Sequence, residues 1–295
     1  MGFLRHGRSI AFPSPPCTLA YSSPVAPPLV SALILNYRTP ADVAKCVRAL
    51  KSQTIADRIE IVVIDNHSDD DSVGRIRNQL LGIGGVRIVE TPLNLGFGGG
   101  NNYGARYVGG EYLLIINPDT ELEPGGIERM VAMLREDPTI GILAPKLQFP
   151  DGTIRDSYRT FPTFFDVIIK RTFFRYLFPR RLKHYLQHDT DPGLQRDIDW
   201  VVGACMFMRR GFYEQLRGFD ERFFLFFEDT DLCRRCWDRG KRVVYCPEVH
   251  AADRKQRLSG GGFLPLFLTK TGRIHVISAV KYFWKWRGAR RVLAA

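Results

Sequence analysis

The sequence lacks any uninterrupted apolar run of the about 18 residues that an ordinary transmembrane helix needs, so it excludes such a helix. Cysteine is also scarce, because the chain has only six, at irregular spacing. That pattern argues against a disulfide framework in a chain of 295 residues. We therefore expect reduced thiols and a cytoplasmic protein.

Acidic residues are absent from the C-terminal end of the chain. From Arg254 onward there are ten Lys and Arg and no Asp or Glu, whereas the other 32 basic residues are balanced by 31 acidic ones. The net charge of +11 therefore lies in the tail. A basic tail on a near-neutral body predicts an anionic partner, which is phospholipid, nucleic acid or a phosphorylated substrate.

The N-terminal segment superficially resembles a signal peptide, because a basic start is followed by uncharged residues. Six prolines between positions 13 and 28 break any apolar helix there. We interpret residues 1–28 as a disordered Pro-rich extension.

The segment after this extension alternates strand and helix patterns. Apolar runs at 29–35 and 59–64 flank a helix that we expect to begin at Pro40, after Thr39. Unbroken apolar strands of this kind predict a parallel sheet that is covered on both faces. The pattern continues with strands at 86–89, 112–116, 140–144, 200–209 and 242–246, and helices at 101–107, 126–135 and 228–239.

Polar residues follow four of these strands, at Asn36-Tyr37, Asp65, Asn94 and Asn117. In doubly wound sheets, ligands bind at the carboxyl ends of the strands. A carboxylate at such a position, like that of Asp65, could accept hydrogen bonds from a ribose or a base. The alternative is a turn or cap residue, since the residues after Asp65 all favour turns.

Two further segments carry weak ligand signals by themselves. Asn94–Asn102 is glycine-rich and opens a helix, which suits an anionic ligand, but it matches neither GxGxxG nor a P-loop. Asp119, in Asn-Pro-Asp, could hold Mg²⁺ or Mn²⁺ against a pyrophosphate. A simple β-turn is the alternative there.

Glu228 and Asp229 follow the aromatic run FFLFF. Carboxylates against apolar surface can have raised pKa values and serve as general bases. The alternative is electrostatic stabilisation of the helix that begins there. Both roles can hold together, because Asp231 is also close.

Six segments occur in a characteristic order: LNYRTP, VVIDNHS, NLGFGGGNNYGAR, LLIINPDTEL, VVGACMFMRR and GFDERFFLFFEDTDLCRRCWDRGKRVVY. As a set they resemble the inverting family-2 glycosyltransferases, and more narrowly the rhamnosyltransferase-like branch. The resemblance covers roughly residues 29–285. It implies a nucleotide-diphospho-sugar transferase fold of the GT-A type, with a mostly parallel twisted sheet flanked by helices.

The resemblance also implies roles for single residues. Asp65 would contact the nucleoside, Asp119 would hold the metal on the donor diphosphate, and Asp229, beside Glu228, would be the catalytic base. His250 would complete the metal site. We expect further donor contacts from residues that lie near the strand ends: Asn36, Tyr37, Asn94, Gly98, Gly99, Asn101 and Asn117.

The sequence departs from the family pattern at two places. Asn117 stands where many relatives have an aspartate, which leaves one firm carboxylate for the metal. Ala251-Ala252-Asp253 replaces small, glycine-rich residues after His250. His250 is therefore either a metal ligand or a structural histidine.

We thus expect a metal-dependent, inverting hexosyltransferase of cell envelope polysaccharide biosynthesis. It would move a sugar, rhamnose among the candidates, from a nucleotide-diphosphate donor to a lipid-linked or cell-surface glycan. The catalytic domain would span 29–262, with a nucleotide-sugar half at 29–145 and an acceptor half at 146–262. A basic amphipathic helical tail at 263–295 would hold the enzyme on the anionic inner face of the cytoplasmic membrane. The alternative is that the tail helix packs on the body of the protein and that its charges are merely solvated.

Three alternatives remain open. The first is a glycosyltransferase with a soluble acceptor, and the second a nucleic-acid-binding protein with a basic aromatic tail, although no nucleic-acid motif is present. The third is a structural zinc on Cys233, Cys236, Cys246 and His250. The sequence specifies neither the donor sugar and its nucleotide nor the acceptor or the oligomeric state.

Overall fold

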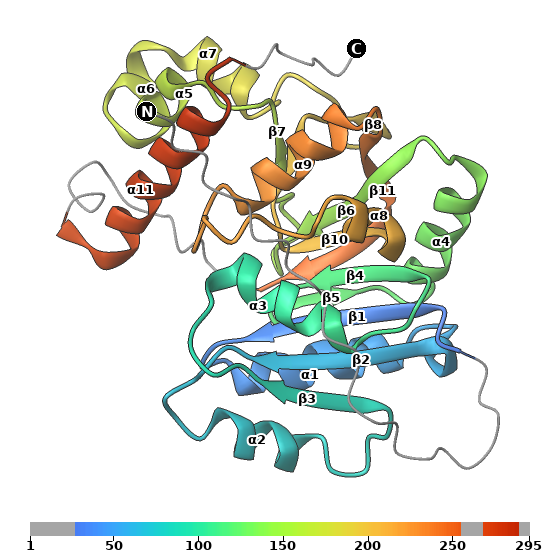
Figure 1. Ribbon diagram of the computed structural model, residues 1–295. Coiled ribbons are helices and arrows are strands. Elements are labelled where there is room, and N and C mark those ends of the chain that lie inside the picture. Colours follow the sequence, from blue (N-terminus) through green and yellow to red (C-terminus); the bar gives the residue numbers. More distant parts are fainter. Residues whose placement is uncertain (1–26, 255–267, 289–295) are drawn as a thin grey trace, which may run out of the picture.

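The computed structural model describes residues 27–254 and 268–288. Residues 1–26 of the expected extension, and residues 255–267 and 289–295 near or in the expected tail, lie outside the described residues. A nine-stranded sheet runs through the molecule in the order β3-β2-β1-β4-β10-β6-β11-β5, with β8 also paired to β11 (Figure 1).

The strands are β1 Val30–Asn36, β2 Ile59–Asp65, β3 Val86–Glu90, β4 Tyr112–Ile116, β5 Thr120–Leu122, β6 Ile140–Gln148, β7 Tyr158–Arg159, β8 Arg196–Asp197, β9 Trp200–Val201, β10 Cys205–Arg209 and β11 Arg242–Asp253. The α-helices are α1 Pro40–Lys51, α2 Ser72–Gln79, α3 Gly96–Gly104, α4 Gly126–Glu136, α5 Phe164–Arg171, α6 Phe174–Leu177, α7 Pro179–Tyr185, α8 Arg210–Gln215, α9 Glu228–Asp238 and α11 Lys270–Lys285.

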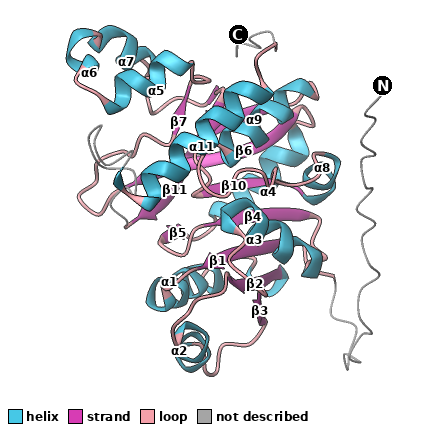
Figure 2. Cartoon of the chain, turned by 60° about the vertical axis from the view of Figure 1, so that its left-hand side comes forward, coloured by secondary structure: helices cyan, strands magenta, loops and turns pink. Residues whose placement is uncertain are grey.

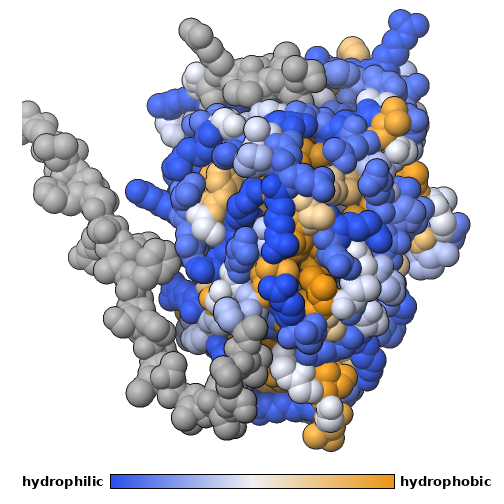
Figure 3. Space-filling model, turned by 90° about the vertical axis from the view of Figure 1, so that its right-hand side faces the viewer, coloured by the Kyte–Doolittle hydropathy of each residue, from blue (hydrophilic) through white to orange (hydrophobic). Residues whose placement is uncertain are grey.

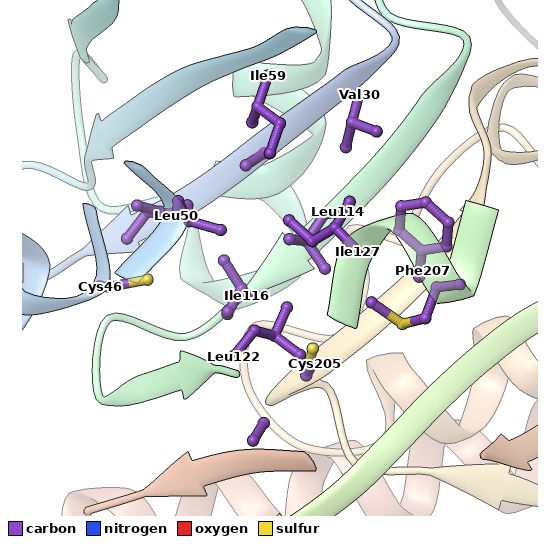
Figure 4. Close-up of a cluster of buried hydrophobic side chains, with 14 of the residues drawn as sticks. Val30, Cys46, Leu50, Ile59, Leu114, Ile116, Leu122, Ile127, Cys205 and Phe207 are labelled. Carbon is purple, nitrogen blue, oxygen red and sulfur yellow. The ribbon is translucent and has the colours of Figure 1, made fainter. Parts of the chain in front are cut away.

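Strands β3, β2, β1 and β4 pair in parallel, and β10 enters antiparallel between β4 and β6. Helices cover both faces of the sheet (Figure 2). Side chains of α1, α2 and α4 pack on one face, against residues such as Val30 and Leu114 (Figure 4). Residues of α3, α8 and α9 pack on the other face, against Leu33 and Leu113. Burial on both faces explains why β1, β2 and β4 are mostly apolar without strict alternation.

Most predicted elements are confirmed, and two differ in an instructive way. The expected strand at 200–209 is divided into β9 and β10, because the Gly203 N–H donates to the side chain of Asp229 instead of to a neighbouring strand. The helix expected at 101–107 begins earlier, at Gly96. Glycine is required in it, since a Cβ on Gly98 would lie 2.8 Å from the Cβ of Phe219.

A smaller layer lies beyond the main sheet. It contains the two-stranded β7–β9 sheet, the short helices α5–α7, and α11, which lies beside them (Figures 1 and 2). Phe164 of α5 and Phe283 of α11 are in edge contact, with ring centroids 5.7 Å apart. These elements stand over the carboxyl-terminal side of the parallel strands and thereby bound the site described below.

Helix α11 is anchored on α9 and the loop before it. Tyr282 is fully buried and its ring centroid lies 5.2 Å from that of Phe227. Asp231 of α9 accepts a hydrogen bond from Trp286 Nε1 at 2.9 Å and pairs with Lys285 at 2.6 Å. The tail helix therefore packs on the body, and its other side stays exposed.

Candidate active site

The carboxyl ends of β1 and β2 place two polar residues side by side. The parallel register sets Asn36 opposite Asp65, and the Asn36 amide donates to the Asp65 carboxylate at 2.6 Å. The Ser68 N–H donates to the other carboxylate oxygen at 2.9 Å. Asp65 is buried and held in one orientation. Tyr37, next to it, is exposed, with the Arg38 guanidinium 5.1 Å from its ring centroid.

The loop into α3 is organised by an asparagine pair. The Asn66 amide donates to Asn94 Oδ1 at 3.1 Å, and Asn94 Oδ1 also accepts the Gly96 N–H at 2.9 Å. Asn66 is a polar residue that the sequence did not single out, because turn-forming residues surround it. Gly98, Gly99 and Asn101 lie buried within α3. The Asn101 amide donates to Phe97 O at 3.0 Å.

A cavity of about 230 Å³ lies next to this edge of the sheet. It brings together four of the predicted site residues, from elements far apart in the sequence: Asn117, Asp119, Glu228 and Asp229. Its wall also contains cationic and aromatic residues that the sequence did not reveal as site residues: Phe97, Arg155, Arg159, Lys170, Tyr185, Trp200 and His275.

Asp229 is positioned by the start of α9 and by the break between β9 and β10. One of its carboxylate oxygens accepts the Gly203 N–H at 3.0 Å, and the other accepts the Thr230 N–H at 2.7 Å. Phe226 and Phe227, just before α9, have φ of 69° and 67°, which is unfavourable for bulky residues. Such strain persists where the surrounding structure enforces it, often at functional sites.

Burial raises the pKa of both adjacent carboxyl groups. For Glu228, which is only 4% exposed, burial and then the charge of Asp229 raise the pKa well above its ordinary value. Burial also raises the pKa of Asp229, while the two backbone N–H donors and then the charge of Arg159 oppose the rise. Asp229 thus combines raised basicity with a fixed orientation, as a general base requires.

Asp119 lies in the turn after β4. Thr120 N donates to Asn117 O at 3.1 Å, and Arg254 N donates to the Asp119 carbonyl at 3.1 Å, which fixes the backbone. One carboxylate and one amide oxygen fit Mg²⁺ or Mn²⁺, which take their remaining ligands from water and substrate phosphates. Within 27–254 and 268–288, no group of three or more His, Cys, Asp or Glu is arranged to hold a metal without such added ligands.

His250 does not line the cavity that holds Asp119. It borders a separate hollow, together with Lys45, Glu121 and Gln148. The four candidate zinc ligands do not converge: Cys233 and Cys236 of α9 are buried in the core on one face of the sheet, whereas Cys246 of β11 lies in the other core, with its Sγ 3.2 Å from the sulfur of Met133. Asp119, together with Asn117, therefore remains the candidate metal ligand.

The family model for Glycosyl transferase family 2 matches residues 31–217, more than half of the chain. The chain is 28% identical over 235 residues to the N-acetylglucosaminyl-diphospho-decaprenol L-rhamnosyltransferase of Mycobacterium tuberculosis. That alignment covers 72% of this chain and 73% of the relative. The predicted similarity to the rhamnosyltransferase-like branch is confirmed.

Two solved structures share the fold. GalNAc-T7 with UDP, GalNAc and Mn²⁺ has a TM-score of 0.60 at 16% identity; the match covers 79% of this chain but only 45% of that one. The mannosyltransferase PcManGT from Pyrobaculum calidifontis with GDP-Man and Mn²⁺ has a TM-score of 0.55 at 15% identity, covering 91% and 78%. The predicted GT-A type fold, with a mostly parallel central sheet flanked by helices, is confirmed.

The raised pKa of Glu228 predicts a pH-dependent stability. The folded chain binds this proton more tightly than the unfolded chain, so the free energy of unfolding should fall as the pH rises from the ordinary glutamate value toward the raised one. Glu228→Gln removes this loss. In urea unfolding, the stability of this variant relative to wild type should be lowest near the ordinary glutamate pKa of 4.5 and should rise as the pH increases above that value.

The matched control is Glu136→Gln. Because Glu136 is exposed on α4, this substitution should leave the free energy of unfolding close to that of wild type at each pH. A Glu228→Gln protein that is less stable than wild type at about pH 8 would show that the charged form is stabilised by contacts other than those described.

Proposed function

The chain belongs to glycosyl transferase family 2, and we propose that it transfers a sugar, with inversion, from a nucleotide-diphosphate donor to a lipid-linked glycan. The observation that carries this proposal is that Asp119 and Asp229 line one cavity, beside the polar ends of the parallel strands. A donor site and a base for the acceptor must adjoin in a single displacement reaction.

The donor nucleoside would lie at the ends of β1 and β2. There the Asp65 carboxylate, oriented by Asn36 and Ser68, would accept hydrogen bonds from the ribose or base. The name of the mycobacterial relative supports rhamnose as the sugar. That relative is 28% identical to this chain. The identity of the donated sugar and of its nucleotide is therefore proposed for this chain and not carried over from the relative.

The donor diphosphate would lie against Asn117 and Asp119. The two fold neighbours contain Mn²⁺, with UDP and GalNAc in one and GDP-Man in the other, which supports a divalent cation at this point. Bound there, such an ion would neutralise the negative charge that develops on the departing nucleotide diphosphate. Asp119 and Asn117 would hold it, with the turn between β4 and β5 fixing their backbone.

Asp229 would take the proton from the acceptor hydroxyl. As the proton moves to the carboxylate, the hydroxyl oxygen forms a bond to the anomeric carbon, and the bond from that carbon to the diphosphate oxygen breaks on the opposite side. The backbone N–H groups of Gly203 and Thr230 donate hydrogen bonds to the carboxylate and hold it in place. Since burial raises its pKa, Asp229 accepts a proton more readily than an exposed aspartate.

The acceptor would be a glycan on a polyprenyl diphosphate at the inner face of the cytoplasmic membrane. The mycobacterial relative is named for such a lipid-linked substrate. The described cysteines are free and buried, which is typical of cytoplasmic proteins. Among the described helices, none combines the length and apolar character needed to cross a membrane. Binding would therefore be to the membrane surface.

The structure offers one surface suited to this role, which we term the aromatic face. It comprises exposed apolar side chains of the α5–α7 region and α11: Phe164, Phe165, Phe173, Tyr176, Leu177, Phe178, Ile277, Val280 and Trp284. Exposed basic residues interrupt it, among them Arg175, Arg180, Lys183, Lys281 and Arg287. The side of the molecule turned away from α11 is mainly hydrophilic, with scattered apolar side chains (Figure 3). Basic and aromatic residues together suit an anionic leaflet.

Asp229→Asn should lower turnover by about 10²–10⁴-fold, because the amide keeps the shape of the side chain but cannot take the proton. Release of the nucleotide, measured across a panel of sugar nucleotides, reports the rate, and the KM for the donor should stay unchanged. The control is Asp69→Asn, at an exposed position. Near wild-type turnover would refute the assignment, and an equal loss confined to Glu228→Gln would transfer the role to that residue.

Asp119→Ala should remove most turnover while leaving the circular dichroism spectrum unchanged. Wild-type activity should vanish in excess chelator and return with Mn²⁺ or Mg²⁺. Glu121→Ala is the matched control, since Glu121 lies two residues away but borders the other hollow. Full activity in excess chelator would exclude a metal role for Asp119.

The aromatic face should bind vesicles of phosphatidylglycerol but not of phosphatidylcholine, and salt should weaken binding, because each basic residue near an anionic leaflet contributes about 1 kcal/mol. Replacing Ile277, Val280 and Trp284 together by serine should abolish co-sedimentation. These side chains are exposed, so folding is preserved. Leu81→Ser, at an equally exposed leucine on the distant α2 side, is the control. Wild-type protein that ignores anionic vesicles at low salt would favour a soluble acceptor.

A further inference from the structure

Arg159 is a buried cation in the cavity wall that the proposed chemistry does not use. It lies in β7, is 8% exposed, and stacks on the Trp200 ring of β9 with 5.0 Å from the guanidinium carbon to the ring centroid. Its Nη2 donates to the Asp156 carbonyl at 3.3 Å. Its Nε is buried and has no hydrogen-bond partner in the described part of the chain.

Arg159 interacts electrostatically with Asp229, which lines the same cavity, but no ion pair joins the two, and a buried guanidinium with an unpaired donor is costly, so its position calls for an explanation. Over the described ranges, Arg159 takes part in no ion pair, whereas the neighbouring Arg155 pairs with the buried Asp253. A buried donor that remains unsatisfied in the free protein is often satisfied by a ligand. Arginine in particular recognises phosphate oxygens through two parallel hydrogen bonds.

A second cation lies on the same side of the cavity. Lys170 of α5 lines it, together with Tyr185 of α7, whose ring centroid is 6.0 Å from the lysine nitrogen. The positive charge of Arg159 partly offsets the rise that burial causes in the pKa of that tyrosine, so the guanidinium lies close to Tyr185. Trp200, Tyr185 and the β7–β9 pairing therefore hold the arginine in place from several sides.

The location of these two cations indicates which anion they would bind. They belong to β7 and α5, whereas the proposed donor ligands Asp65 and Asp119 belong to the parallel half of the sheet. The same helix α5 that carries Lys170 into the cavity exposes Phe164 and Phe165 on the aromatic face. Arg159 and Lys170 thus line the cavity of the proposed base, Asp229, and Lys170 shares its helix with two side chains of the aromatic face.

We propose that Arg159, assisted by Lys170, binds the diphosphate of the acceptor lipid, in a subsite separate from that of the donor diphosphate. This inference rests on the proposed lipid-linked acceptor. In such a molecule the diphosphate connects the sugar to the lipid, so a sugar at Asp229 and a lipid at the aromatic face would place it beside these two cations. The subsite would discriminate diphospholipid acceptors from neutral glycans.

The test is isothermal titration calorimetry with farnesyl diphosphate as a soluble probe for the acceptor, and with UDP, dTDP and GDP plus Mn²⁺ as probes for the donor. Wild type should bind farnesyl diphosphate without metal, and farnesol much more weakly. Arg159→Met should weaken farnesyl diphosphate binding by about tenfold or more, and Lys170→Met by less. Binding of the nucleotide probes should change by less than about twofold.

Because Arg159 is buried, thermal melting must first show that the variant folds. Arg159→Lys keeps the charge and should retain part of the affinity, which a purely structural role would not require. Arg77→Met is the control, since Arg77 forms a surface ion pair with Glu90 at 3.2 Å. A wild-type protein that does not bind farnesyl diphosphate would overturn the subsite, as would a variant that loses nucleotide affinity instead.

The subsite and the proposed function fail in different ways. Transfer to a diphospholipid acceptor with a KM that Arg159→Met leaves unchanged would refute the subsite and leave the transferase standing. Binding of farnesyl diphosphate through Arg159, without nucleotide release from any sugar nucleotide, would keep the subsite and refute the proposed transfer reaction.

Discussion

Strand β1 lies between β2 and β4 and pairs in parallel with both, in a register that sets Asn36 opposite Asp65 and Ile34 opposite Ile116. Parallel pairing of this kind brings the carboxyl ends of the strands to one edge. Asn36, Asp65 and the turn that carries Asp119 therefore reach the same side of the sheet. The apolar residues on both faces of these strands stabilise the register, because a slip by one residue would move every side chain of a strand to the opposite face of the sheet.

The other wall of the site depends on a reversal of strand direction. β10 runs antiparallel beside β4, which brings the residues just before it next to the end of β4, where Asn117 N donates to Ala204 O at 2.8 Å. Gly203 then reaches Asp229 at the start of α9. Because Asp231, three residues after Glu228, ties α9 to α11, the proposed catalytic carboxylates and the tail helix belong to one packed unit.

Sequence patterns predicted the parallel half well, because its strands are rich in apolar residues and polar residues stand at or just after their ends. The strand at Tyr112–Ile116 and the helix start at Pro40 match the prediction. The antiparallel insertion of β10, the short β5 and the division at Gly203 were not predictable. They depend on contacts between residues far apart in the sequence, such as Gly203 with Asp229, Cys205 with Ile116 and Leu122 with Ala251, which periodicity does not record.

The same limit applies to the site. The family resemblance selected Asn117, Asp119, Glu228 and Asp229, and the structure places all of them around one cavity. It also selected His250, which lies at another hollow. Arg159 has no sequence signal that separates it from other arginines, since its importance comes from burial, stacking on Trp200 and an unpartnered Nε.

The central claim is that sugar transfer occurs in one displacement, at a cavity where a single base, Asp229, faces the donor. It is tested most directly by the anomeric configuration of the first product formed, determined by proton NMR before mutarotation or further reaction. A single displacement predicts inversion of the configuration that the sugar had in the donor. Retention would require a second displacement or a front-side attack, and would contradict the role assigned to Asp229.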